Sequence, residues 1–309
     1  MPLHHTSGRH GLGFGLALTT MALWAVLPLA LEGALRSLDV FTLTWARFAV
    51  SSVVLGGVLL LRRDLPRLRV GSARGWLLLA ATGFLALNYG SYVLGLERTS
   101  AADAQVLIQA GPILLSLGGV FVFRERFTRR QWQGFAMLCL GLLVFIAARY
   151  DPAGADAERR IAGNLWIAFA AITWAIYGLA QKQLLRDLPS AHVLLWVYVG
   201  CTLAFTSLAE PSRIGDLNGP ELWLLLFCAL NTVVGYGAFA ESLAHWEASR
   251  VGAVLALTPL GTLALAAIAE AWLPGWTRPQ ALGLWSWLGA VAVVAGSLVT
   301  SLAAPPPET

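Results

Sequence analysis

Amide and aromatic side chains recur at helical spacing within apolar stretches of this 309-residue chain. Phe84, Asn88 and Tyr92 lie four residues apart, and Gln105 and Gln109 repeat that interval on the next apolar stretch. Residues at this interval share one face of a helix. Asn and Gln provide donors and an acceptor for a neutral or zwitterionic group, while aromatic rings suit an apolar group or a cation. The pattern predicts a binding site for a small molecule with polar and apolar parts.

Residues on other apolar stretches extend this candidate site. Trp24 and Trp174 occupy corresponding places in the two halves of the chain, Tyr177 follows Trp174, and Asn231 corresponds to Phe84. The complete set of predicted substrate-binding residues is Trp24, Asn88, Tyr92, Gln105, Gln109, Trp174, Tyr177 and Asn231. A structural role stays open for each, because amides also hydrogen-bond between membrane helices and Trp also packs or lies at the membrane interface.

Charged residues within the apolar stretches are few, and each has two interpretations. Arg47 lies near the start of its stretch and is expected to extend to the outer surface of the membrane. The alternative is a pair with Glu32 or with an anionic substrate. Glu241 and His245 share a helix face and are a candidate proton-coupling pair, although their place near a predicted helix end favours simple contact with water.

Two prolines, Pro112 and Pro259, interrupt apolar stretches at corresponding places. Each removes a backbone hydrogen bond and permits a kink, so both are candidate hinges, with a static kink as the alternative. The sequence contains no HExxH, GxSxG or Walker A motif and no paired aspartates. We therefore expect no enzyme activity, no cofactor, no metal site and no direct use of ATP.

The elements that must position these residues are membrane-spanning helices. The chain is 57% hydrophobic and only 12% charged, whereas a soluble domain has about a quarter of its residues charged. Apolar runs of about 20 residues, enough to cross a bilayer, follow one another almost end to end. We expect an all-α integral membrane protein with ten transmembrane helices, at residues 12–35, 40–61, 75–96, 101–123, 131–149, 162–184, 191–209, 221–244, 249–273 and 280–302.

The 21 basic residues predict the orientation of these helices. Clearly more of them fall on one side of the membrane than on the other if the N-terminus is cytoplasmic, and an even number of spans then places the C-terminus in the cytoplasm too. Because the arginines cluster in short loops between apolar runs, the net charge of +4 indicates membrane orientation rather than nucleic-acid binding.

An internal repeat divides the chain into two halves. TRRQWQG at residues 128–134 returns as TRPQALG at 277–283, and Tyr89-Gly90 and Pro112 recur at an offset of 147 as Tyr236-Gly237 and Pro259. Each half, 12–149 and 162–302, contains five predicted spans. Since five is odd, the second half enters the membrane from the opposite side, which makes an inverted repeat. In transporters the substrate site lies between such repeats, near the membrane midplane.

These residues resemble the drug/metabolite transporter superfamily, in particular EamA-type permeases. The resemblance rests on the segment YVLGLERTSAADAQVLIQAGPILL, on an acidic residue near the end of the following helix, Glu125 or Glu270, and on glycines of the last helix of each half, Gly134, Gly141, Gly283 and Gly289. The proline-to-glutamate interval differs between the halves, so Glu270 is an imperfect counterpart of Glu125. The resemblance implies ten helices, cytoplasmic termini, a central cavity and transport of small metabolites, often as export.

The sequence thus predicts a secondary-active transporter of small metabolites, such as amino acids or amphiphilic compounds, that works by alternating access and acts as an exporter. The first alternative is a multidrug or cation exporter. A membrane-embedded enzyme and a channel are alternatives from other functional classes. The predicted partners are a small-molecule substrate, the lipid bilayer and, as a candidate coupling ion, the proton. The predicted location is a bacterial inner membrane, with the chain as a monomer or homodimer.

Overall fold

The computed structural model describes residues 9–66, 73–123, 128–149, 156–185, 187–245, 251, 254–272 and 282–302, and every regular element in these ranges is helical. The elements are α1 (His10–Ala34), α2 (Val40–Leu61), α3 (Ala73–Arg98), α4 (Ala101–Leu107), α5 (Ala110–Phe123), α6 (Arg129–Arg149), α7 (Ala157–Leu184), α8 (Ser190–Thr206), the short 3₁₀ helix η1 (Pro211–Asp216), α9 (Gly219–His245), α11 (Thr258–Trp272) and α12 (Leu284–Leu302).

Most of these helices have the length and composition of membrane spans. Within the described ranges, six are long and apolar enough to cross a bilayer, namely α1, α2, α3, α6, α7 and α9, and α8 and α12 are shorter apolar helices. The structure has α2 at the residues predicted for it, and most other ends shift by a few residues. The total of ten spans stays a prediction.

The predicted continuous helix at 101–123 is wrong, because the chain breaks it into α4 and α5 at Ile108 and Gln109. Pro112 has no N–H to donate to the Ile108 carbonyl, and the Gly111 N–H bonds that carbonyl instead, at 2.9 Å. A hydropathy pattern predicts where a span lies, but it does not predict that the backbone hydrogen bonds of the helix are interrupted within the span.

The second half contains a break at the corresponding place. Ala256 and Leu257 form a turn in which the Leu257 N–H bonds the Val254 carbonyl, at 3.1 Å, and α11 then begins at Thr258, directly before Pro259. Both breaks therefore lie just before a proline of the internal repeat, as the missing N–H requires.

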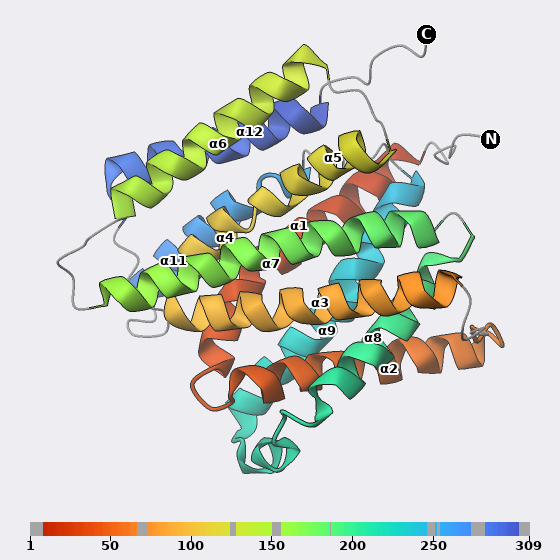
Figure 1. Cartoon of the computed structure of the whole chain (residues 1–309). Helices are drawn as coiled ribbons and strands as arrows, with labels where there is room; N and C mark the ends of the chain where they lie inside the picture. The colour runs from red at the N-terminus through yellow and green to blue at the C-terminus, as the bar shows by residue number, and fades with distance from the viewer. Residues whose placement is uncertain are drawn as a thin grey trace, which may run out of the picture.

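The helices pack in pairs that join the two halves of the chain. Figure 1 shows α3 running along α7 and α6 along α12, and α1 and α2 pack against α9 and α8, respectively. The start of α1 and the end of α12 lie toward the same end of the bundle (Figure 1).

The closest approach within the pair of α6 and α12 depends on glycine. A Cβ on Gly141 would lie 2.6 Å from the Val293 backbone nitrogen, and one on Gly289 would lie 2.6 Å from the Phe145 nitrogen. Small residues of this kind let membrane helices touch backbone to backbone. Gly283, which the family resemblance singled out beside Gly289, meets nothing within 4 Å.

The outer surface of the bundle is apolar, as contact with lipid requires. Large hydrophobic side chains are exposed on most helices, and five of the exposed tryptophans lie close to a helix end, namely Trp76, Trp132, Trp223, Trp272 and Trp285, whereas Trp166 lies further along α7. Trp is enriched at this depth because its ring suits the boundary between headgroups and acyl chains.

Polar caps fix several helix starts. Thr128 Oγ1 accepts from the Gln131 N–H, and Gln131 Oε1 accepts from the Thr128 N–H, which is a capping box for α6. The first copy of the repeated Thr-x-x-Gln motif is therefore a helix start, while its second copy lies outside the described residues. Asp39 caps α2. Partial burial opposes its ionisation, but hydrogen bonds from Thr42 and Phe41 outweigh burial and hold the pKa of Asp39 below its usual value.

Candidate functional site

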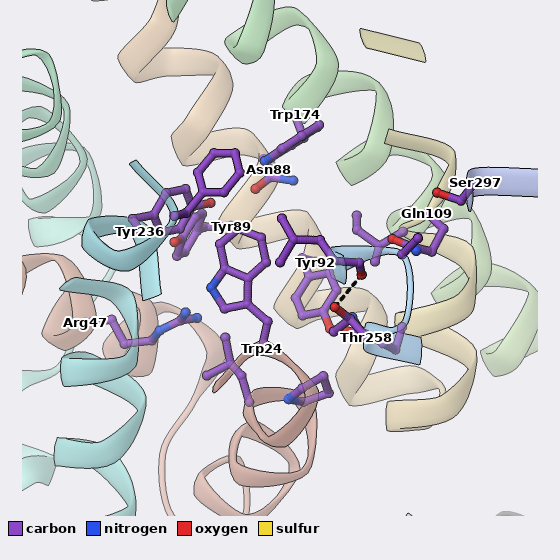
Figure 2. A pocket seen from close by; sticks show the side chains of 17 residues that line it. Trp24, Arg47, Asn88, Tyr89, Tyr92, Gln109, Trp174, Tyr236, Thr258 and Ser297 are labelled. Carbon is purple, nitrogen blue, oxygen red and sulfur yellow. Dashed lines mark hydrogen bonds between the residues drawn. The ribbon is translucent and has the colours of Figure 1, made fainter. Parts of the chain in front are cut away.

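A cavity of about 380 Å³ lies in the interior of the bundle, between helices of both halves and next to the two helix breaks (Figure 2). This volume suits a small molecule. The lining residues are Trp24, Leu27, Pro28, Arg47, Asn88, Tyr89, Tyr92, Gln105, Ile108, Gln109, Trp174, Tyr236, Phe239, Leu255, Ala256, Thr258 and Ser297.

Aromatic rings form much of the cavity wall. The ring of Trp24 lies 5.3 Å from that of Tyr236 and 5.8 Å from that of Phe239, measured between centroids. Gly235 makes room for this arrangement, because a Cβ there would lie 2.6 Å from Trp24 Nε1. Figure 2 shows Trp24 between Arg47 on one side and Thr258 and Gln109 on the other. The wall can therefore hold an apolar group between two polar ends.

Amides and hydroxyls form one of these polar ends. Tyr92 donates to Gln105 Oε1 over 3.5 Å, and Thr258 and Ser297 also line this part of the cavity (Figure 2). Within the described part of the chain, no residue hydrogen-bonds the side-chain amide of Gln109, which is 8% exposed. A nearly buried amide that lines a cavity without a protein partner is available to a ligand.

The two candidate asparagines hold helices together. Asn88 Nδ2 donates to the Ala170 carbonyl of α7 over 2.8 Å, and Asn231 Nδ2 donates to the Leu23 carbonyl of α1 over 2.7 Å. Each asparagine thus ties the third span of one half to the first span of the other. Asn88 also lines the cavity, so its Oδ1 remains able to accept from a ligand.

Arg47 does not extend to the membrane surface, contrary to the expectation from its position in the sequence. Its side chain is 2% exposed and lines the cavity, with Nε donating to Thr232 Oγ1 over 3.3 Å. The guanidinium carbon lies 4.8 Å from the centroid of the Tyr89 ring. The surface position was wrong because α9 and α3 cover this part of α2, which the sequence of α2 alone does not reveal.

The structure brings together most of the predicted binding residues. The cavity is lined by Trp24, Asn88, Tyr92, Gln105, Gln109 and Trp174. Tyr177 instead lies in a hydrophobic cluster with Tyr198 and Leu184, and Asn231 is buried between α9 and α1. Trp174 and Tyr177 are three residues apart on a helix that is apolar on most sides, so the sequence could not decide which of them faces the cavity.

Several lining residues were absent from the prediction. In the sequence, Tyr89 and Tyr236 are markers of the repeat, and Phe239 is the counterpart of Tyr92 at the same offset. Their recurrence at an offset of 147 was the available signal, because a cavity between two related halves is lined by related positions. For Ser297 and Leu255, no such recurrence in the sequence indicated a place in the cavity wall.

The remaining candidates lie elsewhere. Pro259 is buried at the start of α11, beside the lining residue Thr258, and Pro112 lies in the first turn of α5. Glu241 and His245 form a contact of 3.1 Å at the end of α9, beyond its apolar span, and neither lines the cavity. Among the described residues, no three His, Cys, Asp or Glu side chains lie close enough to hold a metal ion.

Comparison with known proteins decides the family. The model of the EamA-like transporter family matches the chain twice, at residues 11–147 and at residues 161–302. The chain belongs to the EamA-like transporter family. It is accordingly a multi-pass membrane protein, and its family and relatives indicate a transporter rather than an enzyme.

Relatives of known name cover nearly the whole of this EamA-like chain. The uncharacterized inner membrane transporter YhbE of Escherichia coli (strain K12) is 37% identical over 296 residues, which are 94% of this chain and 92% of that protein. A probable amino-acid metabolite efflux pump of Salmonella typhimurium (strain LT2) is 24% identical over 267 residues, covering 82% and 85% of the two chains. A solved crystal structure matches with a TM-score of 0.64 at 20% identity, covering 96% of this chain and 98% of that one, which concerns the fold alone.

Proposed function

We propose that this chain is a secondary-active exporter of small metabolites, such as amino acids or amphiphilic compounds, that works by alternating access between two inverted five-helix halves, residues 12–149 and 162–302. The relative from Salmonella typhimurium, named a probable amino-acid metabolite efflux pump, supports the direction and the class of substrate. The cavity supports the size and the amphiphilic character of the substrate.

One observation carries the proposal: the same cavity borders both of the corresponding helix breaks. Gln109 at the first break and Ala256 at the second both line it, and they are equivalent positions at the repeat offset of 147. In many transporters, discontinuous helices of two inverted repeats form the substrate site near the membrane midplane. Neither an enzyme nor a channel needs this arrangement.

The packing of the helices is consistent with the inverted repeat. Under the repeat, the pair of α3 and α7 corresponds to the pair of α9 and α1, and both pairs pack closely. The Ser52 and Thr202 hydroxyls meet at 3.3 Å, and these residues are 150 apart, which is also the separation of the corresponding residues Trp24 and Trp174. A contact between equivalent residues is expected on the axis that relates two halves.

Within this proposal, the substrate is bound by the predicted residues that line the cavity, joined by Arg47, Tyr89, Tyr236 and Phe239. Pro112 and Pro259 act as hinges, because each keeps the adjacent break free to bend. Glu241 and His245 remain the candidate proton-coupling pair. If they couple, Glu241→Gln abolishes proton-driven transport while exchange of substrate for substrate continues; unchanged proton-driven transport excludes the pair.

The proposed orientation has both termini in the cytoplasm of a bacterium, with the protein in the inner membrane as a monomer or homodimer. A fluorescent protein that matures only in the cytoplasm, fused after Thr309, is expected to fluoresce. A dark fusion with normal expression contradicts this orientation.

A growth-protection screen tests the function most simply. Cells that express the chain, and cells that express an Asn88→Ala, Gln109→Ala double variant at the same level, are challenged with amino acids, their toxic analogues and cationic drugs. Protection against amino acids or analogues by the wild type alone, with lower intracellular accumulation, is the expected result. Protection against cationic drugs only would instead favour a cation exporter.

A further inference from the structure

A buried arginine faces the cavity without a carboxylate partner. Arg47 is the eighth residue of α2, about 10 Å along the helix, and is 2% exposed. An arginine side chain stays protonated, and a buried charge is costly unless an opposite charge accompanies it. Charged residues within membrane spans therefore mark functional sites by default.

The direct contacts of Arg47 within the protein are with neutral groups. Nε donates to the Thr232 hydroxyl and the guanidinium lies over the Tyr89 ring, but both partners are neutral. Among the described residues, no Asp or Glu lies within ion-pair distance of Arg47, and no other group accepts from its terminal nitrogens. Glu32, the nearest candidate in the sequence, accepts from the Ala101 N–H at 2.6 Å.

Arg47 is the only charged side chain among the described residues that line the cavity, and the buried Glu32 lies outside that lining. None of the lining residues is acidic. The starts of α5 and α11, each longer than ten residues, lie at the two breaks beside the lining residues Gln109 and Thr258. Helix N-termini carry partial positive charge, so they add to the potential that Arg47 creates. The cavity as a whole therefore favours an anion.

The geometry further restricts the anion. With Nε bound to Thr232, the two terminal nitrogens remain as a planar pair of donors, which is the arrangement that holds a carboxylate. A single guanidinium balances a monoanion, whereas a phosphate monoester carries more charge than the site neutralises. The rings of Trp24, Trp174 and Phe239 offer an apolar wall for the remainder of such a molecule.

We propose that Arg47 is the carboxylate receptor of the transporter, and that its substrates carry a carboxylate next to an apolar body. This inference rests on the proposed function, because it takes the cavity to be the substrate site. It predicts that molecules of the same shape without the carboxylate, whether neutral amides or cations, bind weakly.

Two probes that differ only in the charged group test the inference. Binding of N-acetyl-L-phenylalanine and of N-acetyl-L-phenylalaninamide to the full-length protein in lipid nanodiscs is measured by calorimetry. We expect the carboxylate to bind at least about tenfold tighter than the amide, as a hydrogen-bonded charge pair would give. In Arg47→Gln that ratio falls to about one, while Arg47→Lys retains part of it.

Arg213→Gln removes an exposed arginine outside the cavity and serves as the control. Its ratio of affinity for the carboxylate to affinity for the amide should equal that of the wild type. Failure of the carboxylate to bind, equal binding of both probes to the wild type, or an unchanged ratio in a folded Arg47→Gln overturns the inference. If Arg47→Gln does not fold, the ratio of the two probe affinities in the wild type still tests whether the cavity prefers a carboxylate. Carboxylate preference without any transport in cells contradicts only the proposed function, and transport without carboxylate preference contradicts only this inference.

Discussion

At the scale of single residues, polar side chains in the cavity differ in how much of their bonding the protein already uses. The Asn88 amide nitrogen ties α3 to α7, whereas the Gln109 amide has no bonded partner among the described residues. The exposed fractions of Asn88 and Gln109 are similar, 6% and 8%, yet only Asn88 contributes a hydrogen bond that holds two helices together. Substitutions should therefore separate binding from stability.

Gln109→Ala is expected to lower substrate affinity by about fivefold, the worth of roughly one neutral hydrogen bond, with an unchanged melting temperature. Asn88→Ala should lower affinity and also destabilise the protein by about 0.6–2 kcal/mol, because a hydrogen bond between membrane helices is lost. Binding titrations and thermal unfolding in nanodiscs measure both effects. Wild-type affinity in both variants would remove these residues from the site.

A pair of glycines in α9 tests the aromatic wall. Gly235→Ala places a methyl group 2.6 Å from Trp24 Nε1, so the indole must move and substrate affinity should fall. Gly237, two residues later, meets nothing within 4 Å, and Gly237→Ala should leave affinity unchanged. Because both variants add the same methyl to the same helix, equal affinities would mean that the position of Trp24 does not matter for binding.

At the scale of elements, the two broken helices separate this fold from a simple bundle of continuous spans. The Leu255 carbonyl accepts from the Thr258 hydroxyl, and Pro259→Ala adds the backbone N–H that would let the helix continue through the break. One additional hydrogen bond, worth roughly 1 kcal/mol, should slow the conformational change by about fivefold and leave binding nearly unchanged. Turnover and affinity measured on the same preparation provide the comparison.

Pro112→Ala should have the same effect, since the two breaks correspond. A full rate of turnover in both variants would assign the prolines to static packing.

The contact between α6 and α12 is expected to be sensitive to a single methyl group. Gly141→Ala directs a Cβ at the Val293 backbone nitrogen, which cannot move away as a flexible side chain would, and should destabilise the protein by about 1–3 kcal/mol. Gly83→Ala, at an open position of α3, should be neutral or stabilising by up to about 1 kcal/mol. Thermal unfolding that fails to separate the two variants would mean that the helices do not meet at Gly141.

At the scale of the whole molecule, the sequence predicted the class of fold well and the orientation of side chains only in part. The apolar runs located α2 at its observed residues, because lipid demands a minimum length of apolar helix. The repeat directed attention to Asn88, Gln109 and Trp174, all of which line the cavity. Helices that are apolar on most sides, however, do not reveal which side faces inward, so Tyr177 was expected in the cavity and Tyr236 was not.

Arg47 illustrates what only the assembled helices decide. Its depth along α2 allowed both a surface position and a buried one, and the choice depends on Thr232 of α9 and Tyr89 of α3. The breaks at Gln109 and Ala256 are a second example, because prolines in apolar runs predict a kink but not an interrupted helix. Both features lie at the cavity, where local rules are most often set aside for function.

Alternating access is the central claim, and counterflow measures it most directly. Proteoliposomes are loaded with the unlabelled compound that the growth screen identifies and are diluted into a trace of the labelled compound. A carrier that exposes its cavity to one side at a time exchanges label inward, so label should accumulate transiently above its equilibrium level and then decline. Monotonic equilibration without an overshoot, at a rate proportional to concentration, would indicate a channel and contradict the account.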